Sequence, residues 1–370
     1  MNPKNLHLPF LLLLTLILLH GYGHIPYAQE PYARWDLAAY QRMAEAAPGM
    51  AGDVAKPFAF RVLGPWMAGM LPGSVPGGFR ILSLVASLLL PFQFVALLRV
   101  RGIERGWAVC AAAFFICNRY LYGFTVWNYF QLNDILSLNF LLLSFSALWR
   151  KSWGLFALSL TAGMMARETA LLMVPVLGLW LWEEKASPRT WLMAGTACVP
   201  GVLMFLGLRL WMPTQGGRDL AEAFATHAPK IFSLEIPARL FLNAFLPFSL
   251  LPLIFWRQTL SFVRAYKHLV LFIMLVAAST LFGTNNERLM APAFVAVYFL
   301  IARILQSAKP GPASLSLLFA AAFLASFHHM YGHRPLPDRN WTLGISLGTT
   351  FVVTLWFLWA RKTEHGHSCP

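Results

Sequence analysis

The side chains of this 370-residue sequence that could do chemistry are charged groups at the edges of apolar segments. We expect nine of them on one side of a membrane: Asp36, Lys56, Arg61, Arg119, Asp134, Arg167, Glu168, Glu287 and Arg288. Ionisable groups at such places are costly and usually have a function. Arginine binds phosphate through two parallel hydrogen bonds and stays charged, so the surplus of arginines favours a ligand that carries phosphate. A carboxylate beside that ligand can act as general base on an acceptor hydroxyl or amine.

No stronger signature of another chemistry is present. The sequence contains no nucleotide-binding loop, no HExxH and no GxSxG. In HHMYGH, His329 and His333 are four residues apart, which suits two metal ligands on a helix, although interfacial histidines are more common. The four cysteines include no CxxC pair, which argues against a zinc site or a disulfide framework. We therefore expect no required cofactor, and a divalent metal is an unsupported alternative.

Composition indicates a polytopic integral membrane protein. Hydrophobic residues make up 58% of the chain and charged residues only 12%, whereas soluble domains carry about 25% charged residues. The net charge is +14. Because the basic residues lie mostly in short turns between apolar segments, as the positive-inside rule describes, we expect membrane lipids as partners and no nucleic acid.

The expected fold is all-α, with about twelve transmembrane helices. Candidate spans cover approximately 6–22, 79–98, 107–125, 133–149, 153–166, 169–182, 190–211, 241–256, 268–283, 289–305, 313–330 and 341–360. Basic turns occur at Arg99/Arg101/Arg105, Arg150/Lys151, Lys185/Arg189, Arg257/Arg264/Lys267, Arg303/Lys309 and Arg361/Lys362. With both termini cytoplasmic, every basic turn is cytoplasmic, and we expect a bacterial inner (plasma) membrane protein. The first segment could be a signal peptide, but no small-residue cleavage site follows it, which favours a retained anchor.

The segment 153–182 is too long for one span and carries Arg167 and Glu168 at its middle. As one helix it would be roughly 45 Å long, against a hydrocarbon core of about 30 Å. Since the basic turns on both sides are expected on one face, the segment must form a hairpin that turns near these two charges. Each arm is only roughly 20 Å long, so the turn should lie below the outer headgroups. Its charges must then face a polar cavity or each other, and a structural ion pair is the alternative to a binding site.

Two outer loops, 23–78 and 212–240, are long enough to hold structure. In the first, WDLAAYQRMAEAA places apolar or aromatic residues at a spacing that suits an interfacial helix, namely Leu37, Tyr40, Met43, Ala44 and Ala47. Tyr32 and Trp35 would lie at headgroup depth. KPFAFRVLGPWMAGMLP, residues 56–72, is expected to be a second interfacial piece.

This topology and four local features resemble the GT-C superfamily of membrane glycosyltransferases, which includes protein O-mannosyltransferases and the aminoarabinose transferase that modifies lipid A. A short first span precedes a long outer loop with Asp36 in RWDLAAY, and KPFAFRVLGPWMAG follows in the same loop. QLNDILSL places Asp134 at the mouth of the fourth span, and ARETALLMVP forms the short third outer turn. The likeness covers residues 1–211, expected to be the catalytic module. Residues 212–370, with NNERLMAPAF, form a C-terminal set of transmembrane helices that matches loosely.

The resemblance implies inverting transfer of a sugar from a polyprenyl-phosphate-linked donor to a lipid, glycan or protein acceptor at the extracytoplasmic face. In this interpretation Asp36 deprotonates the acceptor, and Asp134 positions it or assists. The donor phosphate would be held by Lys56, Arg61, Arg167 and Arg288, with Glu168 and Glu287 lining the cavity. Two departures make metal dependence doubtful: Asp36 stands alone between Trp35 and Leu37, where many members have paired acids, and only Asn133 accompanies Asp134, where a DxD is absent.

Other classes of function stay open at this stage. One is a flippase, polymerase-like or other transport protein for lipid-linked saccharides, although transporters more often carry inverted repeats and ionisable groups near the midplane. Another is an assembly subunit without activity. Single residues also have simpler roles: Asp36 as a helix cap, Asp134 as a span-terminal polar group, Lys56 and Arg61 as lipid-facing charges, and Glu287 with Arg288 as a structural pair.

Overall fold

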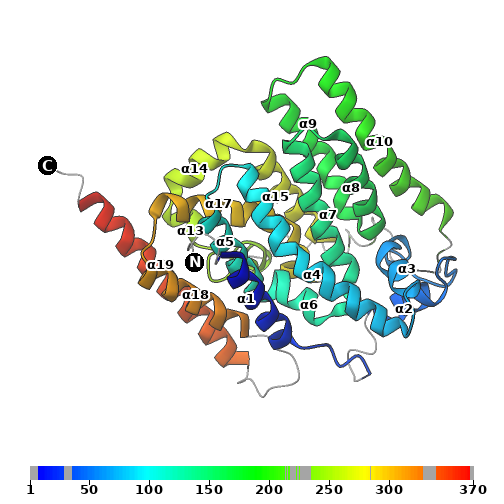
Figure 1. The fold of residues 1–370 in the computed structure, drawn as a ribbon, viewed down its shortest axis with the longest axis horizontal. Coiled ribbons are helices and arrows are strands. Elements are labelled where there is room, and N and C mark those ends of the chain that lie inside the picture. The colour runs from blue at the N-terminus through cyan, green and yellow to red at the C-terminus, as the bar shows by residue number, and fades with distance from the viewer. Residues whose placement is uncertain are drawn as a thin grey trace.

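A computed structural model describes residues 7–28, 36–212, 235–283, 285–327 and 339–366, together with isolated positions between 214 and 225. These residues form helices connected by turns, and no β-strand occurs among them (Figure 1). The all-α expectation is therefore confirmed for this part of the chain.

Among the described residues, four helices are long and apolar enough to cross a membrane. They are α4 (Val75–Val100), Tyr129–Trp149, which contains α7 (Leu132–Trp149), α10 (Pro188–Trp211), and Ala291–Ala308, which contains α17 (Phe294–Ala308). Two bent pairs raise the number to six if each is one span. In one, α5 (Arg105–Ile116) turns by 63° into the helical segment Arg119–Trp127, and in the other α14 (Trp256–Ala265) turns by 99° into α15 (Lys267–Ser279). By length and composition, the described residues thus contain four to six candidate spans. The twelve spans that the sequence predicts stay a prediction.

Several expected spans are shorter helices. They are α1 (His7–Tyr22), α8 (Trp153–Ala166), α9 (Met173–Glu183) and α18 (Pro312–Phe327), while α19 covers Arg339–Gly366. The expected span 241–256 is not one helix, because it is divided among η8 (Ala238–Leu242), η9 (Asn243–Phe245) and α13 (Leu251–Ile254). Pro247 explains the break: it disfavours helical geometry at the preceding residue, and Leu246 accordingly has an extended ψ of 143°.

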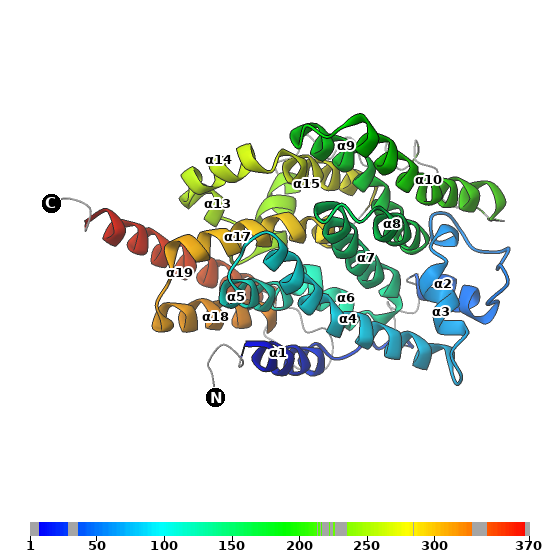
Figure 2. The same ribbon diagram turned by 45° about the horizontal axis from the view of Figure 1, so that its top comes forward.

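Helix α7 lies at the centre of the bundle, between α4 and α8, and is almost entirely buried (Figures 1 and 2). The Ser144 and Ser159 hydroxyls are 2.9 Å apart where α7 packs against α8. On the other side of α8, a Cβ on Gly201 of α10 would come within 2.8 Å of Leu160 Cγ. Small and hydroxyl-bearing residues allow such close approach of helices in membrane proteins, so α7, α8 and α10 pack closely together.

Basic turns from distant parts of the sequence meet at one end of the bundle, here called the basic end. The Arg101 guanidinium lies over the Trp149 ring at 4.9 Å and over the Tyr266 ring at 5.1 Å. Arg303 Nη1 donates a hydrogen bond to the Tyr266 hydroxyl at 2.8 Å, and Glu104 N donates to Gln306 Oε1 at 2.8 Å. The sequence expectation that these turns share one face is confirmed for the described contacts.

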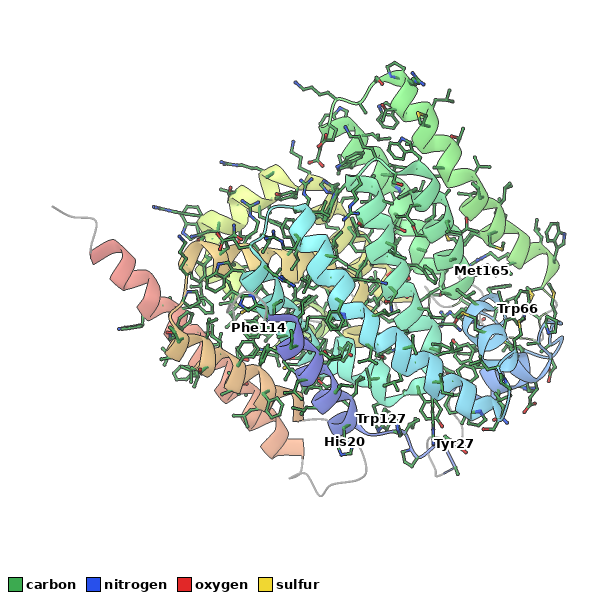
Figure 3. All side chains as sticks on the ribbon, in the orientation of Figure 1. His20, Tyr27, Trp66, Phe114, Trp127 and Met165 are labelled. Carbon is green, nitrogen blue, oxygen red and sulfur yellow. The ribbon has the colours of Figure 1, made fainter. Side chains whose placement is uncertain are left out.

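Residues 36–72 gather at a different end of the molecule from α14 (Figures 1 and 2). They form α2 (Leu37–Glu45), η3 (Phe58–Phe60) and α3 (Leu63–Gly69). α2 buries Tyr40, Met43 and Ala44, as its spacing predicts. Its buried face packs against α3, which in turn contacts α8, so that Trp66 and Met165 lie in the same region (Figure 3). Tyr32 and Trp35, also expected here, lie outside the described residues.

Candidate functional site

Five charged side chains from four distant segments meet at the end of the bundle where α3 packs. This ionic cluster consists of Arg61, Asp134, Arg167, Glu168 and Arg288. Arg61 follows η3, and Asp134 lies in the first turn of α7. Arg167 and Glu168 join α8 to η6 (Glu168–Leu172), and Arg288 lies on α16 (Asn286–Leu289).

The predicted turn in 153–182 lies where the two charges are. α8 ends at Ala166, Arg167 is extended with φ −161° and ψ 139°, and the 3₁₀ turn begins at Glu168. At the far ends of the two arms, Lys151 Nζ is 3.8 Å from Glu184 Oε2, so both arms return to the basic end. Because successive side chains of extended backbone point in opposite directions, Arg167 and Glu168 do not pair with each other, and each finds a partner elsewhere.

Arg167 and Arg288 both contact the Asp134 carboxylate. Arg167 Nη1 lies against Oδ1, and Arg288 Nη1 is 3.7 Å from Oδ2. Asp134 is 4% and Arg167 5% exposed. Both oxygens of Asp134 are thus ion-paired, whereas the Nε atoms of Arg167 and Arg288 have no hydrogen-bond partner among the described residues. Buried N–H groups without a partner are costly, which makes this place the candidate for a binding site.

Arg61 is held by a different carboxylate. Its Nη2 and Nε donate to Glu168 Oε1 and Oε2 at 2.5 and 3.1 Å, and its Nη1 lies 3.4 Å from the Tyr40 hydroxyl. Burial acts to lower the pKa of the Arg61 guanidinium, but the charge and hydrogen bonds of Glu168, together with Tyr40 and Asp134, raise that pKa well above its ordinary value. Arg61 therefore stays charged and ties the 56–72 segment to the α8–η6 connection.

Asn133 fixes the same segment onto α7, a role that sequence reasoning missed. Its Oδ1 accepts a hydrogen bond from Gly64 N at 2.9 Å, and its Nδ2 donates to Arg61 O at 2.9 Å. A Cβ at Gly64 would lie 2.7 Å from Asn133 Oδ1, so this approach requires glycine. In the sequence, Asn133 is visible only as an amide residue beside Asp134. The backbone groups that it bonds lie 69 and 72 residues earlier in the chain.

Asp36 lies at the start of α2 and is half-buried. Its side chain makes no capping hydrogen bond to the helix. Instead, Gln131 Nε2 donates to Asp36 Oδ2 at 2.9 Å. Gln131 directly precedes α7, and Asp134 lies three residues further on. The contact therefore brings Asp36 to the chain segment that carries Asp134, so the two predicted catalytic carboxylates lie at the same end of the bundle.

Glu287 forms an ion pair with Arg239. Arg239 Nε and Nη2 donate to Glu287 Oε1 and Oε2 at 2.8 and 2.9 Å. Arg239 lies in a stretch that the sequence analysis treated only as loop, so this pair was missed. Arg288 does not pair with Glu287. Its guanidinium contacts Asp134 and lies 5.5 Å from the centre of the Phe124 ring.

Lys56, predicted to hold phosphate, is exposed. No ion pair of its side chain occurs among the described residues, and its backbone N donates to Gly216 O at 3.3 Å. The structure thus brings together Arg61, Arg167 and Arg288 but places Lys56 at the surface. No group of three metal-binding side chains occurs within the described part of the chain, and HHMYGH lies outside it.

Charge is unbalanced within the ionic cluster. Within these five side chains, three arginines meet two carboxylates, which gives a net charge of +1 at a largely buried place, although each arginine contacts a carboxylate. The neighbouring Arg239–Glu287 pair is neutral and does not change this balance. Because a net positive charge at a largely buried place is unfavourable, the arrangement is suited to an anion.

Comparison with known proteins adds no further identification: no protein-family model, curated protein or solved structure matches the chain.

Proposed function

We propose that the protein is a glycosyltransferase of the GT-C type. It takes a sugar from a polyprenyl-phosphate-linked donor and transfers it, with inversion, to a lipid, glycan or protein acceptor at the extracytoplasmic face of a bacterial inner membrane. In this proposal the chain crosses the membrane about twelve times, the basic end is cytoplasmic, and the ionic cluster faces outward. The observation that carries the proposal is the buried cluster with its surplus positive charge.

Arg167 and Arg288 are proposed to bind the phosphate of the donor. Both guanidinium groups touch Asp134, and both carry an Nε without a hydrogen-bond partner among the described residues. Phosphate oxygens are strong acceptors for such N–H groups. Asp134 then acts as a positioning residue that holds the two guanidinium groups side by side. Arg61 is engaged through two hydrogen bonds by Glu168, so its contribution is to set the local charge and to hold the loop.

The reaction requires stabilisation of the leaving phosphate and removal of a proton from the acceptor. An acceptor oxygen or nitrogen attacks the anomeric carbon, the bond from that carbon to the phosphate oxygen breaks, and the phosphate leaves with the electron pair. Negative charge grows on the leaving phosphate, where fixed guanidinium groups stabilise it. The acceptor must lose its proton, and Asp36 is the proposed base. Its position beside Gln131, at the same end as the cluster, supports this division of roles.

Donor binding is the direct test. The purified full-length protein is incubated with a panel of polyprenyl-phosphate sugars, and the melting temperature is recorded for the wild type and for Arg167→Lys. At least one donor should raise the wild-type melting temperature, and the shift should be much smaller in the variant, because an ammonium group cannot replace a two-pronged guanidinium. Arg189→Lys, at the exposed start of α10, is the matched control and should respond like the wild type. An equal donor response in Arg167→Lys would contradict the proposed phosphate site.

A further inference from the structure

Helix α14 is an amphipathic helix at the basic end, where the sequence analysis expected only a basic turn. It meets α15 at 99°, so it runs across the direction of that helix. Phe262 is buried and packs against Phe299 at 5.4 Å between ring centres. Trp256, Leu260 and Val263 are exposed on the same helix. An apolar side, a basic side and a crosswise orientation are typical of helices that lie in a membrane interface.

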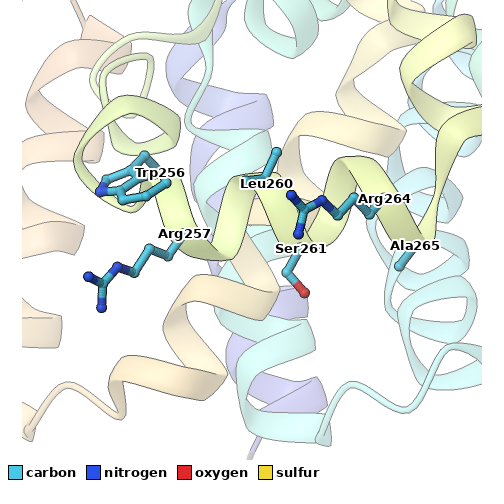
Figure 4. A pocket seen from close by; sticks show the side chains of 6 residues that line it. All are labelled: Trp256, Arg257, Leu260, Ser261, Arg264 and Ala265. Carbon is cyan, nitrogen blue, oxygen red and sulfur yellow. The ribbon is translucent and has the colours of Figure 1, made fainter.

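A shallow depression of about 490 Å³ lies on this helix. It is lined by Trp256, Arg257, Leu260, Ser261, Arg264 and Ala265, which are spread along the whole length of α14 (Figure 4). Arg257, Ser261 and Arg264 are spaced by four and three residues, so they share one face of the helix. The two arginines are two turns apart, roughly 10 Å along the axis. Both side chains therefore can reach one ligand between them.

The two arginines are not neutralised within the protein. Both are exposed, and none of the ion pairs among the described residues includes either of them. The Arg257 guanidinium lies 5.6 Å from the Trp256 ring, much as Lys267 Nζ lies 5.5 Å from the Trp182 ring, and such ring contacts do not cancel the charge. Arg257 and Arg264 thus form a local excess of positive charge next to exposed apolar side chains.

We propose that α14 is a binding site for the headgroup of an anionic phospholipid in the leaflet at the basic end. The phosphodiester lies between Arg257 and Arg264, which donate to its oxygens, and the Ser261 hydroxyl donates a further hydrogen bond. Trp256 lies at the boundary between headgroups and acyl chains, where tryptophan is enriched. A lipid fits better than a soluble phosphate, because its acyl chains also cover the exposed Leu260 and Val263. The site is separate from the ionic cluster, and its test does not depend on the proposed transferase activity.

Native mass spectrometry of the full-length protein, titrated with phosphatidylglycerol or with phosphatidylcholine, tests the site. The variant is Arg257→Gln/Arg264→Gln. The matched control is Arg105→Gln/Arg189→Gln, which removes two exposed charges from other turns of the basic end. Loss of an arginine that donates a hydrogen bond to the phosphodiester should weaken binding at least about fivefold, so the α14 variant should bind phosphatidylglycerol roughly 30-fold more weakly. The control should stay within about threefold of the wild type, and phosphatidylcholine binding should be unchanged in both.

Three results would overturn the proposal. Equal weakening in both double variants would show that the effect is diffuse surface charge. Unchanged phosphatidylglycerol binding in the α14 variant would remove these arginines from lipid binding. Displacement of phosphatidylglycerol by an equal concentration of inorganic phosphate would identify a soluble-anion site. The melting temperature of each variant is measured alongside, and Arg257→Lys/Arg264→Lys, which keeps both charges but not the guanidinium geometry, should bind phosphatidylglycerol more tightly than the glutamine variant.

Discussion

Replacing Asp134 by asparagine separates a ligand-binding cluster from a purely structural ion pair. Asp134 is the carboxylate that contacts both Arg167 and Arg288, and it is 4% exposed. The substitution keeps the shape but raises the surplus charge of the ionic cluster by one. Removing one partner of a buried ion pair costs about 3–5 kcal/mol, so the free variant should melt roughly 4–6 °C below the wild type. A bound phosphate supplies the missing negative charge and should restore part of this loss.

The assay compares melting temperatures of wild type and Asp134→Asn, with and without a saturating polyprenyl-phosphate sugar. The donor-induced rise should be larger in the variant than in the wild type, because the same ligand now neutralises a more positive site. Glu184→Gln is a control that removes the carboxylate of an exposed ion pair, at 3.8 Å from Lys151. It should cost less than about 1 kcal/mol and leave the donor response unchanged. A smaller donor-induced rise in Asp134→Asn, or a loss of stability no larger than that of the control, would refute the reasoning.

Three further predictions concern the attachment of the 56–72 segment, the Arg61–Glu168 pair of the ionic cluster, and the side of the membrane that the first outer loop faces. Asn133→Ala leaves Gly64 N and Arg61 O without their partner and should cost about 2 kcal/mol in thermal unfolding; a change below about 0.5 kcal/mol would show that these bonds do not hold the segment. Glu168→Gln breaks a pair whose carboxylate side chain is 30% exposed, so we expect a loss on the order of 1–3 kcal/mol and faster proteolysis within residues 56–72, whereas unchanged cleavage would contradict the proposed tether. Asp53→Cys lies on the exposed surface and should react with a membrane-impermeant thiol reagent from the extracytoplasmic side; labelling only from the cytoplasm would reverse the orientation.

Local features of the fold followed from the sequence, whereas the pairing of charges did not. The break at Arg167 was predictable because two charges interrupt an apolar segment between basic turns. The helix over residues 37–45 was predictable from the spacing of its buried side chains. Which carboxylate each arginine meets depends on how α3, α7 and α8 pack, and Arg61 and Glu168 are 107 residues apart. Hydrophobicity alone does not encode that packing.

Two differences between the sequence expectation and the structure have identifiable causes. The segment 241–256 has the apolar composition of a span, but Pro247 interrupts it, and composition scans do not penalise one proline. α14 was treated as a basic turn because its arginines dominated the pattern, although Phe262 marks a buried face. The candidate site was also missing Asn133 and Arg239, since a single amide and a loop arginine carry no local signal of their distant partners.

The most direct test of the proposed transferase is the rate of sugar transfer by Asp36→Asn. Gln131 Nε2 donates to Asp36 Oδ2 at 2.9 Å, and an asparagine oxygen can accept the same bond, so the variant should fold and bind the donor normally. It lacks the negative charge that takes the proton from the acceptor. At matched donor occupancy we expect transfer to fall on the order of 10²-fold or more, with the melting temperature and donor affinity unchanged. Transfer at nearly the wild-type rate would contradict the assignment of Asp36 as the base.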